Sequence, residues 1–97
     1  MASIRQLKKD IDYLVSQVVI DCFLCNRFFE GAREEATHEI MEEILVLGGE
    51  LRKRVNQQGE SKDPKALRSH YRAIGRDLLA GCDKAYGKLG ELKGKES

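Results

Sequence analysis

The chain has 97 residues, enough for one domain around a single hydrophobic core. Charged residues make up 34% of it, yet the formal net charge is only +1. No global charge therefore indicates binding to nucleic acid or to a membrane surface. With one proline and no tryptophan, the composition is typical of a helical bundle, and we predict one all-α domain over residues 1–97.

The first predicted helix covers residues 4–29. Ser3 and Gln6 have the spacing of a capping box, in which side chains satisfy free amides of the first turn. Apolar residues then recur at spacings of three and four, the period of one helix face. This stripe consists of Ile4, Leu7, Ile11, Leu14, Val18, Cys22, Cys25 and Phe29. Gly31 follows it, and glycine readily adopts the left-handed conformation that ends many helices.

The second predicted helix covers residues 33–57. Its apolar stripe consists of Ala36, Ile40, Ile44, Leu47, Leu51 and Val55. Its first turns are acidic and its last turns are basic, and both biases suit the helix macrodipole. Gly48 and Gly49 lie inside the helix, where each costs about 1 kcal/mol relative to alanine. We interpret the pair as a local kink or a close helix contact rather than a functional hinge.

The third predicted helix covers residues 64–91. It follows a polar loop around Gly59, with Asp63 as N-cap and Pro64 at the first helical position. Its stripe consists of Leu67, Tyr71, Ile74, Leu78, Cys82, Ala85, Leu89 and Leu92. Short connections make sequential helices antiparallel neighbours. The predicted fold is therefore an up-down-up antiparallel three-helix bundle.

The first helix also carries a second apolar face. Residues 13–29 are too apolar for a one-sided surface helix, but polar residues interrupt them too often for a membrane span. At about 100° per residue, several apolar side chains fall away from the main stripes of the first two helices. The expected self-association surface consists of Tyr13, Ile20, Phe23, Leu24, Met41 and Leu45.

A contiguous exposed apolar patch usually marks a partner surface. We therefore predict a two-fold homodimer, which would form a larger helical bundle. Two alternatives stay open. The second and third helices could wrap around the first, or this face could bind a helix of another protein.

The cysteines raise the question of a metal site. Cys22 and Cys25 form a C-x-x-C, and Cys82 and His38 are expected near the same height in the bundle. Three cysteines and a histidine would suit tetrahedral zinc. However, His38 lies about 140° from the centre of its stripe and should point outward. We interpret the cysteines as core packing, with a small metal-binding protein as an alternative.

No group of residues suggests catalysis, so we predict a non-enzymatic protein without a cofactor. His70 flanks the third stripe, and no serine, cysteine or carboxylate is placed to complete a nucleophilic pair with it. No glycine-rich segment has the pattern of a phosphate-binding loop. The opening MASIRQLKKD lacks the apolar region of a signal peptide, and the odd number of cysteines suits reduced thiols. We therefore expect a cytoplasmic protein.

Charge is segregated along the sequence. Residues 30–50 carry seven glutamates against only Arg33, whereas residues 52–76 carry eight basic residues against two acidic ones. The expected basic patch consists of Arg52, Lys65, Arg68, Arg72 and Arg76. A solvated helix face would explain it. The alternatives are salt-sensitive binding of a nucleic-acid backbone, and attraction between the basic pole of one molecule and the acidic pole of another.

The segments IRQLKKDIDYL, HEIMEEIL and KALRSHYRAI together resemble a functionally uncharacterised family of small helical proteins from Bacteroidetes. The resemblance covers nearly the whole chain. It implies an all-helical fold and supplies no catalytic residues. Our overall prediction is a self-associating interaction or scaffold module. A weak nucleic-acid-binding module is the first alternative to it.

Overall fold

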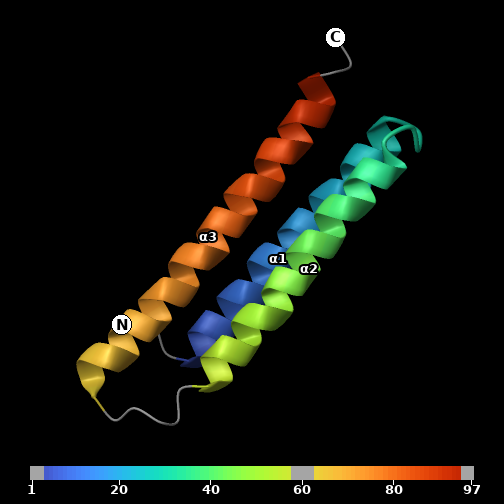
Figure 1. Cartoon of the computed structure of the whole chain (residues 1–97). Helices are drawn as coiled ribbons and strands as arrows, with labels where there is room; N and C mark the ends of the chain where they lie inside the picture. The colour runs from blue at the N-terminus through green and yellow to red at the C-terminus, as the bar shows by residue number, and fades with distance from the viewer. Residues whose placement is uncertain (1–3, 58–62, 95–97) are drawn as a thin grey trace.

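The computed structural model describes residues 4–57 and 63–94. They form three helices, α1 (Ile4–Phe28), α2 (Glu34–Asn56) and α3 (Pro64–Gly94). Every pair of helices is in contact, and the bundle is a rod of 53 × 17 × 17 Å (Figure 1). The predicted up-down-up antiparallel three-helix bundle is confirmed. The predicted helix bounds agree to within one residue, except that α3 continues three residues further.

The α1 helix ends in a Schellman motif. The Gly31 amide donates to the Asn26 carbonyl at 2.9 Å, and the Glu30 amide donates to the Arg27 carbonyl at 3.1 Å. Gly31 has a φ of 82°, as expected for a helix-ending glycine, but Glu30 also has a positive φ, of 53°. A residue with a Cβ pays a steric cost in this conformation. Glu30 therefore occupies a position that favours glycine.

The start of α3 follows the sequence prediction. The Asp63 Oδ1 atom accepts a hydrogen bond from the Lys65 amide at 3.1 Å, which is the N-cap interaction, and Pro64 is the first helical residue. The predicted capping box at Ser3 and the loop around Gly59 lie outside the described residues.

Apolar side chains from all three helices form one core. Its buried members are Leu7, Ile11, Val15, Val18, Cys22, Cys25, Phe29, Ile40, Met41, Ile44, Leu51, Val55, Ile74, Leu78, Cys82, Ala85 and Leu89. Val15 is buried where Leu14 was expected, and Leu14 packs at the edge. Thr37 is also fully buried, and its hydroxyl donates to the Arg33 and Glu34 carbonyls of its own helix, each at 3.0 Å.

The α1 and α2 helices approach each other closely at Gly48. A Cβ added to this buried glycine would lie 3.0 Å from Cγ2 of Val15. The glycine therefore serves a close helix contact, one of the two structural interpretations made from the sequence. At Gly49 an added Cβ would meet no atom of the described residues within 4 Å. Beside this contact, Arg52 of α2 forms an ion pair with Asp12 of α1.

The α3 helix is held to its neighbours by polar contacts at the edges of the core. Lys88 binds both carboxylate oxygens of Glu43, at 2.7 and 2.9 Å, and Arg54 binds Asp77 at 2.6 Å. The His70 ring lies 2.7 Å from the Arg54 carbonyl oxygen at the end of α2. These contacts join α3 to α2 along most of their shared length.

Candidate interaction surfaces

The outer face of α1 is exposed as the sequence predicted. Five of the six residues of the expected self-association surface have exposed fractions between 47% and 63%. They are Tyr13, Ile20, Phe23, Leu24 and Leu45. Phe28, which was not predicted, extends the face and is 75% exposed. Its spacing of four residues from Leu24 was the signal in the sequence.

Met41 is a correction to the predicted surface, because only 9% of it is exposed and it belongs to the core. Met41 and Gly48 are seven residues apart and therefore lie on the same side of α2. Since Gly48 lets α1 come close on that side, α1 covers Met41. We use "outer face of α1" below for Tyr13, Ile20, Phe23, Leu24 and Phe28, with Leu45 of α2 beside them.

One charged residue, Asp21, lies between Tyr13 and Leu24 on α1. Its carboxylate accepts a hydrogen bond of 2.6 Å from the Tyr86 hydroxyl of α3. Burial and this bond raise the pKa of Tyr86 to about 12. Between Tyr13 and Leu24 the outer face thus carries no charge apart from a carboxylate that is already bound, and the exposed Arg27 lies beside Phe28 at its end.

A hollow of about 400 Å³ continues this face at the end of the rod, where α1 meets the last turns of α3. It is lined by Leu24, Cys25, Phe28 and Lys93. The apolar surface of α1 therefore reaches the boundary with α3.

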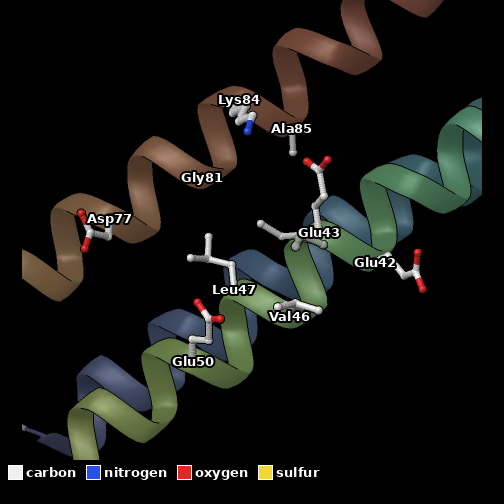
Figure 2. Close-up of a pocket in the computed structure, with 10 residues that line it drawn as sticks. Glu42, Glu43, Val46, Leu47, Glu50, Asp77, Gly81, Lys84 and Ala85 are labelled. Carbon is white, nitrogen blue, oxygen red and sulfur yellow. The ribbon is translucent and has the colours of Figure 1, made fainter.

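A second surface, which sequence reasoning missed, is a groove between α2 and α3 (Figure 2). Its volume is about 490 Å³. It is lined by Glu42, Glu43, Ile44, Val46, Leu47, Glu50, Asp77, Gly81, Lys84 and Ala85. Leu47 extends from α2 toward Gly81, where an added Cβ would overlap its Cδ2 atom. Because Gly81 has no side chain, Leu47 occupies the space beside the α3 backbone.

The groove is acidic, with four carboxylates and one lysine among its lining residues. Glu43 is paired with Lys88, whose hydrogen bond lowers the pKa of the Glu43 carboxyl, and Asp77 is paired with Arg54. Glu42 and Glu50 are exposed and form no ion pair within residues 4–57 and 63–94. The groove thus combines apolar lining residues with two exposed carboxylates and one lysine, Lys84, none of which forms an ion pair with another described residue.

The cysteines lie where the core-packing interpretation placed them. Cys22, Cys25 and Cys82 are all buried and free. Burial, with Cys25 and Asp21 nearby, raises the pKa of Cys22 to about 11, and burial likewise raises the pKa of Cys82. The thiols of Cys22 and Cys82 are therefore protonated at neutral pH, the less reactive form. His38 is exposed, as predicted from its angle, and the described residues contain no cluster of three candidate metal ligands.

The predicted basic patch is only partly available. Lys65, Arg68, Arg72 and Arg76 are exposed on α3, whereas Arg52 is bound to Asp12. The three arginines of α3 form no ion pair with another described residue. Tyr71, the aromatic residue in this region, is partly buried against the core. It offers no open platform for a base.

Of the helices in the described residues, none has the length and hydropathy needed to cross a membrane. The resemblance to a Bacteroidetes family, made on the residue patterns alone, stays a prediction. The chain matches no protein-family model, no curated protein and no solved structure.

Proposed function

We propose that this chain is a non-enzymatic interaction module that self-associates through the outer face of α1. The observation that carries the proposal is the exposure of this face, which presents six large apolar side chains. Burying one such side chain is worth about 1.5–3 kcal/mol. Between Tyr13 and Leu24 the face also lacks free charge, and the cores of protein interfaces are depleted of charged residues.

A two-fold dimer is the simplest assembly that buries this face. In such an interface, the same patch on both chains packs against its copy. Pairing of α1 with its mate would place Ile20 and Leu24 of each chain near the middle of the interface. The dimer would then be a larger helical bundle, with the basic and acidic poles left at its surface.

Sedimentation equilibrium over a range of concentrations tests the proposal. We expect a dimer mass for the parent chain and a monomer mass for Ile20→Lys, because a lysine at the interface would be desolvated without a partner. Val46→Lys places the same substitution on an exposed apolar residue of α2, beside the groove, and should leave the mass unchanged. A monodisperse monomer of the parent chain at high micromolar concentration would contradict the proposal.

We also propose that the protein is cytoplasmic, because the reducing environment of the cytoplasm keeps cysteine thiols free. Three free, buried cysteines with no disulfide among them fit that compartment.

A second candidate function is salt-sensitive binding of a nucleic-acid backbone by α3. The supporting observation is that Arg68, Arg72 and Arg76 are exposed and unpaired in the described part of the chain. Filter binding at low salt should show weaker retention of nucleic acid for Arg68→Glu/Arg72→Glu than for the parent. Arg27→Glu, at the opposite end of the rod, is the control. Equal retention by the double variant and the parent would end this candidate.

A further inference from the structure

The α2/α3 groove is distinct from the outer face of α1. Leu45 and Val46 are consecutive residues, but a helix turns about 100° between them. Leu45 lies beside the outer face, whereas Val46 lines the groove and is 60% exposed. The molecule therefore presents two apolar surfaces on different sides of α2, and the proposed dimer would cover only one of them.

The groove has the dimensions of a helix-binding surface. Its lining residues on α2 fall between Glu42 and Glu50, a segment of nine residues that spans about 12 Å along the helix. Two small residues, Gly81 and Ala85, line its α3 side. Leu47 of α2 fills the space beside Gly81, so apolar side chains of a partner would pack on Leu47 and beside Ala85. A hollow of about 490 Å³ accommodates a few such side chains spaced along one helix face.

The charges of the groove decide the chemistry of its occupant. Glu42, Val46 and Glu50 follow one another at spacings of four residues, so they form a single ridge on α2. This ridge presents an apolar side chain between two carboxylates. The matching surface is a helix with an apolar side chain between two basic ones. Nucleic acids and anionic lipid headgroups would be repelled by the same carboxylates.

We propose that the α2/α3 groove binds a basic amphipathic helix of another protein. Apolar side chains of that helix would pack on Val46, Leu47 and Ala85. Its lysines or arginines would pair with Glu42 and Glu50. The carboxylates of Glu43 and Asp77 already have internal partners and would stay bound to α3 and α2. A second copy of this chain would dock here with a different surface, giving open head-to-tail chains instead of a closed dimer.

The probe is a fluorescein-labelled amphipathic peptide of about 18 residues, made of leucine and lysine. A leucine–glutamate peptide with the same apolar face is its counterpart. Fluorescence anisotropy should report binding of the lysine peptide, and at least about tenfold weaker binding of the glutamate peptide. Equal binding of both peptides overturns the proposal, as does no binding of the lysine peptide.

Variants locate the binding site. Val46→Asp should weaken binding of the lysine peptide, and Glu42→Lys/Glu50→Lys should weaken it by at least about tenfold. Leu79→Asp is the control for Val46→Asp, because Leu79 is 59% exposed and Val46 is 60% exposed. Glu34→Lys/Asp83→Lys is the control for Glu42→Lys/Glu50→Lys, because it makes the same change of net charge at residues outside the groove. If either control weakens binding of the lysine peptide as much as the groove variant it is matched to, the groove is not the peptide-binding site.

The same samples separate this proposal from the dimer. All substituted residues are exposed, so circular dichroism should report folded variants. Sedimentation of Val46→Asp should give the parent mass. A lower mass would make a second copy the occupant of the groove and overturn the proposal. Loss of the dimer in Ile20→Lys with peptide binding retained supports both proposals at once.

Discussion

The α1–α2 pair and the α3 helix are joined to the core in different ways. The first two helices are connected by residues 29–33 alone and make the most extensive contact in the bundle, with Gly48 against Val15 at its centre. The contact between α1 and α3 is the least extensive. At its edges α3 depends on ion pairs and hydrogen bonds, among them Lys88–Glu43, Arg54–Asp77 and Tyr86–Asp21.

This difference agrees with the positions of the groove and the hollow described above. The α2/α3 groove and the α1/α3 hollow both border α3, whereas α1 and α2 pack directly against each other at Gly48 and Val15. A glycine takes part in each kind of contact. Gly48 brings two helices together, while Gly81 receives the Leu47 side chain and leaves a groove beside it. The hairpin of α1 and α2 is thus the more extensively packed part of the molecule, and the two hollows described above lie along α3.

The largest effect should come from breaking the close contact of α1 and α2. Gly48→Ala should lower the free energy of unfolding by about 1–2 kcal/mol, because the new Cβ would lie 3.0 Å from the buried, β-branched Val15 side chain, which would have to shift. Gly49→Ala, the adjacent control, should raise it by about 0.5–1 kcal/mol through helix propensity alone. Urea denaturation measures both. Equal effects of the two substitutions would mean that the contact at Gly48 is not tight.

Native-state hydrogen exchange compares the two regions directly. Core amides of α3, near Ile74 and Leu78, should exchange at least about tenfold faster than those near Ile11 and Val18 of α1, a difference of about 1.4 kcal/mol. The reason is that α3 can open without separating α1 from α2. Uniform protection across the three helices would show instead that the bundle opens as one unit.

The connection between α1 and α2 can be made more stable. Glu30→Gly should raise the free energy of unfolding by up to about 1 kcal/mol, since glycine adopts the positive φ of 53° without a steric cost. Gly31→Ala should have the opposite sign, because the φ of Gly31 is 82°. Thermal and urea denaturation of both variants test the expectation, and a destabilised Glu30→Gly chain would contradict it.

The smallest effect concerns the contact of α3 with α1. The pKa of Tyr86 is raised from 10.0 to about 12, so the folded chain holds this proton more tightly than the unfolded chain. The resulting stability is complete below the unfolded pKa and is lost as the pH rises through about 12. Between about pH 10 and pH 12, urea midpoints of the parent should fall more than those of Tyr86→Phe. If the urea midpoints of the two chains fall by the same amount, the contact between Tyr86 and Asp21 does not stabilise the folded chain.

The sequence was sufficient for the fold because each helix carries its own signals. Asp63 and Pro64 begin α3, Gly31 follows α1, and the apolar periods determine which sides face inward. The same angles identified the outer face of α1. These signals are local, and each can be evaluated within a single helix.

The sequence was insufficient where two helices determine the outcome together. Met41 is buried on the side of α2 where Gly48 meets α1, and Leu47 of α2 lies against Gly81 of α3 beside the groove. Such pairings depend on the relative height and rotation of neighbouring helices, which periodicity within one helix does not contain. The positive φ of Glu30 was missed because the sequence analysis assigned the left-handed conformation to Gly31, the next residue, alone.

The buried cysteine thiols can report the opening of the helical bundle. Cys22 and Cys82 lie on α1 and α3, and both are near the Tyr86 hydroxyl. A thiol reagent added to the folded protein should therefore react with the fully buried Cys22 mainly when the bundle opens. Peptide mapping after a short labelling pulse should show Cys22 of α1 and Cys82 of α3 becoming accessible together if α3 separates from α1. The timing of bundle opening could thus be followed without adding a probe to the chain.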